Sequence, residues 1–180
     1  MISREDAIKI LDTVKNENLK KHMKAVASIM EEMADKLGED RDVWWLTGLL
    51  HDIDYEIADY NEHGKISAEM LEGKLPKYAL HAIKAHNDRT GFYPENKIDY
   101  ALIACDAISG LIVASALVMP NKKVSEVKIE TLKNKFKDKS FARKVDRKRI
   151  MEYEKIGIPF DDFLSLALEG VKKISDELDL

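Results

Sequence analysis

The sequence predicts a single all-α domain, because helix signals recur along the whole chain while strand signals are nearly absent. Apolar residues return at helical spacing in several long stretches, and residues that favour helix ends flank them. The chain has 180 residues, 45% hydrophobic and 34% charged, which is enough for one core in an ordinary globular protein. We find no internal repeat, no low-complexity segment and no clear linker, so we expect one domain over residues 1–180.

End signals predict the first three helices. Ser3 is placed to cap a short helix, and Asn16 precedes a long amphipathic stretch that Gly38 ends. Asp40 is placed to cap a third helix, whose tryptophans we assign to packing. The apolar stripe of the long stretch comprises Leu19, Met23, Val26, Met30, Met33 and Leu37.

The middle of the chain is predicted to alternate polar segments with short helices. A polar segment, DYEIADYNEHG, precedes a helix over about residues 64–72. Pro76 is expected as the first residue of the next helix, because proline is favoured at that position. The run HNDRTGFYPENK contains Gly91 and Pro94 and is predicted to be a loop.

Residues 101–120 are apolar over nearly the length of a transmembrane span. Asp106 argues against a span, since an acid inside a bilayer costs about 2.5–3.5 kcal/mol. We expect the most buried helix of the bundle here and no membrane insertion. A basic segment and a last helix, capped near Asp161 or Asp162, are expected to wrap residues 121–180 back onto the core.

Charge is unevenly distributed along the chain. The net charge is −4, yet residues 122–149 hold twelve Lys or Arg against four acids. Two interpretations stay open for this segment, a solvated helical face and an arm that attracts anions such as phosphates. The single cysteine, Cys105, excludes an internal disulfide, and the first residues lack a secretory pattern. Both features fit a cytoplasmic protein.

The stretch LLHDIDYE places His51 and Asp52 directly after an apolar run. A charge beside buried surface needs a partner. Asp106 raises the same question on the most apolar helix, and no Lys or Arg occurs between Lys97 and Lys122. Its partner must therefore be a metal ion, or a histidinium or an arginine from elsewhere in the chain.

Taken together, His22, His51, Asp52 and Asp106 offer two imidazoles and two carboxylates from three helices. Such ligands suit Mn, Fe, Co, Ni or Zn, and with less preference Mg. A second ion could be held by His63 and His86, with Asp52 bridging the two; the sequence leaves one or two ions open.

This pattern resembles the HD-domain superfamily of metal-dependent phosphohydrolases. The doublet lies within GLLHDID, and the later aspartate lies within IACDAISG. EHG at 62–64 and AIKAH at 82–86 resemble the two additional histidine positions of dinuclear members, which include the hydrolases that split diadenosine tetraphosphate. The resemblance covers residues 16–119 and implies an HD-type helical bundle, with residues 121–180 as a helical extension packed on it.

Carried over position by position, the resemblance implies a first metal on His22, His51, Asp52 and Asp106, and a second on His63 and His86 with Asp52. It implies hydrolysis of a phosphate ester or anhydride of a small nucleotide-like substrate by metal-activated water. Asp52 would position the metals. His81 has no matching role. The loop after His86 differs from the HHE…GYP signature of cyclic-dinucleotide phosphodiesterases, since Asn87 replaces the second histidine.

Other residues carry two interpretations each. Lys65 and Lys84 could contact a phosphate or simply face solvent, and Asp54 could orient a ligand histidine or lie exposed at a helix end. Cys105 is expected in the core. Tyr93 is the candidate for contact with a nucleobase.

Two other functions compete with hydrolysis. One is a non-catalytic nucleotide sensor with a structural metal, which a missing ligand would have favoured. The other is a nucleic-acid binder that uses the basic segment, which the acidity of the remaining chain disfavours. Oligomeric state is left open.

Overall fold

The computed structural model describes all 180 residues, and it contains helices and turns but no strand, which confirms the all-α prediction. Two long helices, α2 (Glu17–Leu37) and α6 (Lys97–Leu117), form its centre. The other α-helices are α1 (Arg4–Leu11), α3 (Arg41–Leu50), α4 (Lys65–Met70), α5 (Lys77–Ala85), α7 (Ile129–Lys137), α8 (Arg147–Ile150), α9 (Phe160–Lys173) and α10 (Ser175–Leu178). Short 3-10 turns are η1 (Asp88–Thr90), η2 (Val124–Glu126) and η3 (Met151–Ile156).

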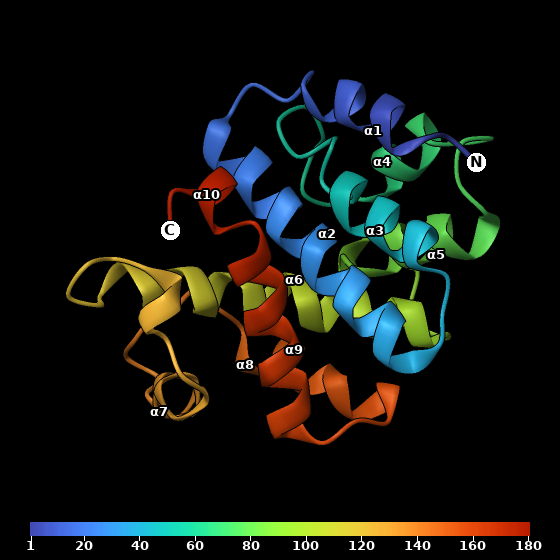
Figure 1. Cartoon of the computed structure of the whole chain (residues 1–180). Helices are drawn as coiled ribbons and strands as arrows, with labels where there is room; N and C mark the ends of the chain where they lie inside the picture. Colours follow the sequence, from blue (N-terminus) through green and yellow to red (C-terminus); the bar gives the residue numbers. More distant parts are fainter.

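Helix α2 is the hub of the packing, since it contacts α3, α6 and α9. Figure 1 shows α6 crossing behind α2 and α9, so segments from both ends of the chain meet at the centre. The 46 residues of the buried apolar core run from Ala7 to Leu180. The extension therefore shares one core with residues 16–119 and packs on the bundle as predicted.

Caps form where the sequence predicts them in the first half of the chain. The side chains of Ser3, Asn16 and Asp40 each accept a backbone N–H at the start of their helices. Gly38 ends α2 with a φ of 68°, in the left-handed region where a Cβ is unfavourable.

Helix α6 is long and apolar enough to cross a membrane by length and composition alone. In the structure it lies inside the bundle, with 61% of its most apolar window buried. It begins at Lys97, earlier than predicted, and the carboxylate of Asp99 accepts the backbone N–H of Asn96 just before the helix.

Three predicted helix boundaries differ from the structure by one to three residues. Pro76 precedes α5 as its N-cap instead of standing inside it, and the helix predicted over 64–72 spans only Lys65–Met70. Asp161 and Asp162 do not cap the last long helix, which begins at Phe160 after Pro159. Their carboxylates lie in its first turn, where their negative charges interact favourably with the positive end of the helix dipole.

Candidate metal centre

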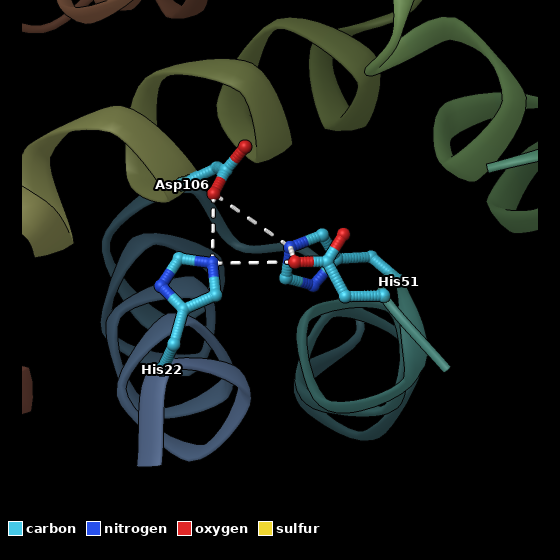
Figure 2. A group of neighbouring side chains, drawn as sticks. His22, His51 and Asp106 are labelled. Carbon is cyan, nitrogen blue, oxygen red and sulfur yellow. Dashed lines mark ion pairs between the residues drawn. The ribbon is translucent and has the colours of Figure 1, made fainter. Parts of the chain in front are cut away.

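The first cluster brings together His22 from α2, His51 and Asp52 at the end of α3, and Asp106 from α6. Figure 2 shows the side chains of His22, His51 and Asp106 converging from their helices. Their candidate ligand atoms all lie within 4.8 Å of one another. Nε2 of His22 is 2.9 Å from Oδ1 of Asp106 and 3.4 Å from Oδ2 of Asp52. Nε2 of His51 is 3.2 Å from Oδ2 of Asp52 and 3.7 Å from Oδ1 of Asp106.

Gly48 allows the close helix contact that places this cluster. A Cβ at Gly48 would lie 2.8 Å from the Cα of Ala27, so α3 can approach α2 this closely only without a side chain there. His51 follows Gly48 by one helical turn and His22 lies on α2, so the contact brings the two imidazoles to the same centre.

The second cluster consists of Asp52, His63 and His86. Oδ1 of Asp52 is 3.1 Å from Nε2 of His63 and 3.2 Å from Nε2 of His86. The two Nε2 atoms are 3.3 Å apart. Since Oδ2 of Asp52 faces the first cluster, this one carboxylate joins the two clusters.

Backbone carbonyls fix the tautomers of two of these histidines. Nδ1 of His51 lies 2.7 Å from the carbonyl oxygen of Gly48, and Nδ1 of His86 lies 2.5 Å from that of Ile83. A carbonyl only accepts, so each Nδ1 carries the hydrogen and donates it. The Nε2 lone pair of each neutral ring is thereby turned toward the carboxylates, as a metal ligand requires.

Side chains fix the other two rings. Asp54 is fully buried, and its Oδ1 lies 2.6 Å from Nδ1 of His63. The Oδ2 of Asp54 accepts the backbone N–H groups of Gly64 and Ser67. Nδ1 of His22 lies 3.2 Å from the hydroxyl of Ser109, which itself donates to the carbonyl of Asp106 and so can accept from the ring. A carboxylate behind a ligand histidine is a frequent feature of metal sites.

The carboxylates give the two clusters a strongly negative potential when no cation is present. Burial alone would lower the pKa of His22, but the carboxylates of Asp106 and Asp52 raise it to about 9. Burial is likewise outweighed at His63, where Asp52 and Asp54 raise the pKa to about 9. The charge of Asp52 raises the pKa of His51 well above its usual value. The centre therefore has to hold positive charge, either as protons or as metal ions.

The environment of one buried histidine nitrogen favours metal ions over protons. Nε2 of His51 is fully buried and makes no hydrogen bond. A buried nitrogen without a partner is costly, and here it is turned toward two carboxylates that are themselves potential ligands. Imidazole and carboxylate donors at this spacing fit a divalent transition metal.

The clustered residues other than the fully buried His51 line a cavity of about 1020 Å³. Tyr55 and Tyr60 line it on the segment that follows α3, and both rings are largely exposed. Lys144 and Arg149 line it from the extension. Sequence reasoning did not single out either tyrosine, and it counted Lys144 and Arg149 only among the twelve cations of the basic segment. The signal for Arg149 was the buried charge of Asp106, for which a distant arginine was one of three possible partners.

Arg149 forms an ion pair with Asp106, since one of its Nη atoms lies 3.2 Å from Oδ2 of that carboxylate. The pKa of Asp106 lies well below its usual value, because the hydrogen bond from His22 and the positive charges of His22 and His51 outweigh the effect of burial. The structure thus supplies Asp106 with a histidine and an arginine, two of the three partners that the sequence left open.

The remaining predicted residues lie away from the cavity. Lys65 pairs with Glu62 at 3.5 Å, and the ammonium of Lys84 lies 4.9 Å from the ring centre of Phe92. Tyr93 is exposed and does not line the cavity. Cys105 is buried in the core, as expected, and Nδ1 of His81 lies 2.9 Å from a carboxylate oxygen of Asp99.

Comparisons with known proteins agree with this geometry. The HD domain family matches residues 19–107, a range that includes all six clustered residues. Ribonuclease Y from Thermoanaerobacter pseudethanolicus is 33% identical over 190 aligned positions, which cover 97% of this chain. The chain spans about a third (36%) of the length of that relative. No solved structure matches the chain. Residues 19–107, which carry the clustered histidines and aspartates, therefore form an HD domain within this chain.

Proposed function

We propose that this protein is a metal-dependent phosphohydrolase that cleaves a phosphate ester or anhydride of a small nucleotide-like substrate. The observation that carries the proposal is the pair of clusters joined by Asp52, with every Nδ1 of the four histidines held so that Nε2 faces the centre. The HD domain formed by residues 19–107 supports the same reaction class.

Each cluster would hold one ion, taken from Fe, Mn, Co, Ni, Zn or Mg. The first would bind His22, His51, Asp52 and Asp106, and the second would bind His63 and His86 with Asp52. A divalent ion at such a site lowers the pKa of bound water toward about 7 and neutralises phosphate charge.

The protein contributes position and shape. Asp52 spans both clusters and fixes their separation. The rings of His51 and His86 are almost fully buried, whereas His22 and Asp106 are partly exposed and line the cavity. A phosphate would therefore approach over His22 and Asp106. The exposed rings of Tyr55 and Tyr60 offer apolar faces on which a nucleobase could stack.

The test is a hydrolysis screen on metal-stripped protein. Mn²⁺, Co²⁺ or Ni²⁺ would be added back, and phosphate release from nucleotides and simple phosphate esters would be measured, with Asp52→Asn as the inactive control. We expect release that depends on added metal. Tight nucleotide binding without release under any metal would favour the sensor instead. We expect the reaction in the cytoplasm, in keeping with a single reduced cysteine.

A second substrate class is favoured by the relative named Ribonuclease Y, whose similarity extends over nearly the whole chain. Hydrolysis of an RNA phosphodiester would use the same centre. A labelled oligoribonucleotide added to the same screen separates the two: shortened RNA with no release from mononucleotides would identify this protein as a ribonuclease.

A further inference from the structure

The segment that joins α7 to α8, residues 138–146, packs on α6 beside Asp106. Gly110 lies at this contact, since a Cβ there would come within 3.2 Å of Cγ2 of Val145, closer than an ordinary van der Waals contact. Asp106 and Gly110 are four residues apart and share one face of α6. The contact at Gly110 therefore brings the start of α8 to the same face of α6 as the candidate metal centre.

Arg147 holds the segment in one conformation. All three nitrogens of its guanidinium donate to backbone carbonyls, at distances between 2.5 and 3.3 Å. The accepting residues are Lys135, Phe136, Asp138, Phe141, Ala142 and Val145. Ala142 has a φ of 47°, a left-handed conformation that a non-glycine residue adopts only when its surroundings impose it.

Arg149, two residues later, is bound quite differently. Its guanidinium makes one side-chain hydrogen bond, to Oδ2 of Asp106, and lines the cavity. Figure 2 shows one oxygen of Asp106 directed at the imidazoles and the other directed away from them. An arginine has five N–H donors, so this contact fixes the guanidinium while leaving donors free for another acceptor.

Two neighbours complete the local charge distribution. Lys144 is exposed and lines the same cavity. Asp146 also lines it, but its carboxylate is engaged at the start of α8, where it accepts the backbone N–H of Lys148 at 2.9 Å. The segment and α8 together thus offer two cations, Lys144 and Arg149, and one engaged carboxylate to the cavity.

We propose that Arg149, assisted by Lys144, forms an anion subsite that binds phosphate oxygens of the substrate beside the metal centre. The inference rests on the proposed function and assigns part of its site to the extension, outside the matched HD domain. Guanidinium groups suit phosphate because two parallel N–H donors match two of its oxygens. The lysines near His63 and His86 in the sequence do not line the cavity, whereas Arg149 and Lys144 do.

The experiment measures binding of inorganic phosphate to the Mn²⁺-loaded full chain by titration calorimetry. We expect Arg149→Ala to weaken phosphate binding by about tenfold or more, the size of a lost charge-assisted hydrogen bond. Arg149→Lys should bind with intermediate affinity, and Lys144→Ala should show a smaller loss than Arg149→Ala. Arg143→Ala is the matched control, because Arg143 is exposed on the same segment and does not line the cavity.

Bound Mn²⁺ and helical content are measured on every variant. Arg149→Ala with wild-type phosphate affinity would overturn the inference. So would loss of Mn²⁺ in parallel with phosphate, since Arg149 would then act only through Asp106. Failure of the proposed function has a different signature: the wild-type chain itself would bind no Mn²⁺, and both proposals would fall together.

Discussion

The two clusters of the candidate metal centre are built in different ways. The first takes His22, His51 and Asp106 from three packed helices, so its geometry is set by the core. The second takes His63 from the turns after α3 and His86 from the end of α5. Its geometry depends on one buried carboxylate, Asp54, which ties the ring of His63 to backbone N–H groups. The first cluster is therefore expected to tolerate local changes that the second does not.

Replacement of the shared residue should have the largest effect. Asp52→Asn removes the charge that joins the clusters, so we expect metal content and hydrolysis both to fall by more than about 100-fold, beyond the range caused by outer partners of ligands. Elemental analysis and the phosphate-release assay measure the two losses. A variant that keeps one tightly bound ion would show that the clusters do not depend on a common carboxylate.

Single-cluster variants separate the two sites. His86→Ala should remove the ion of the second cluster and leave the first, because His86 contributes to only one of them. His22→Ala is the reciprocal change. If two ions bind, each variant should lose one per chain while the circular dichroism of the helices is unchanged. Loss of both ions from His86→Ala would mean that the first cluster cannot hold metal alone.

Asp54→Asn tests the anchor of the second cluster. An amide nitrogen would face at least one of the donors that Asp54 now accepts, at His63, Gly64 or Ser67. We expect affinity at the second cluster to fall about 10–100-fold, the usual effect of removing an outer partner. Unfolding free energy should fall by about 1–3 kcal/mol, the cost of an unsatisfied buried polar group. Equal weakening of both clusters would contradict the separation.

Local signals predicted much of the fold. The caps at Ser3, Asn16 and Asp40 and the glycine stop at Gly38 depend on a few neighbouring residues, and the structure has each of them. Starts without a side-chain cap, such as that of α9 after Pro159, were placed less well. Proline fits at or before the first helical residue, so the sequence alone does not fix the boundary.

In the candidate site, too, residues that follow a local sequence pattern were predicted, whereas residues brought in by tertiary folding were not. The six clustered histidines and aspartates follow a spacing that resembles a family, and the structure brings all six together; that they bind metal stays a prediction. Arg149 lies 43 residues from Asp106, and only the folding of the α7–α8 segment onto α6 brings the two into contact. Tyr55 and Tyr60 lie in a polar stretch without periodicity, so nothing local distinguished them from surface residues.

The pH dependence of stability distinguishes protons from metal as the cation of the centre. In metal-free protein the pKa values of His22 and His63 are raised to about 9, so their stabilising contribution is complete below about 6.5, the value in the unfolded chain. It is lost as the pH rises through 9. We therefore expect metal-free protein to lose stability between pH 7 and 10 and metal-loaded protein to lose less, as measured by urea unfolding. Identical profiles would mean that the metal does not replace these protons.

The smallest effects are expected from the two lysines that neighbour the second cluster in the sequence. Lys65 and Lys84 each lie two residues from a candidate ligand, yet their ammonium groups contact Glu62 and the ring of Phe92 outside the cavity. Exposed contacts of this kind contribute about 0–1 kcal/mol, so Lys65→Ala and Lys84→Ala should change metal affinity and turnover by less than about twofold. The turnover of both variants is measured beside that of Arg149→Ala. This shows whether a cation near the ligands in sequence or one near them in the fold contributes to turnover. A loss for Lys84→Ala as large as that for Arg149→Ala would place the phosphate at the α5 side of the centre and contradict an anion subsite on the extension.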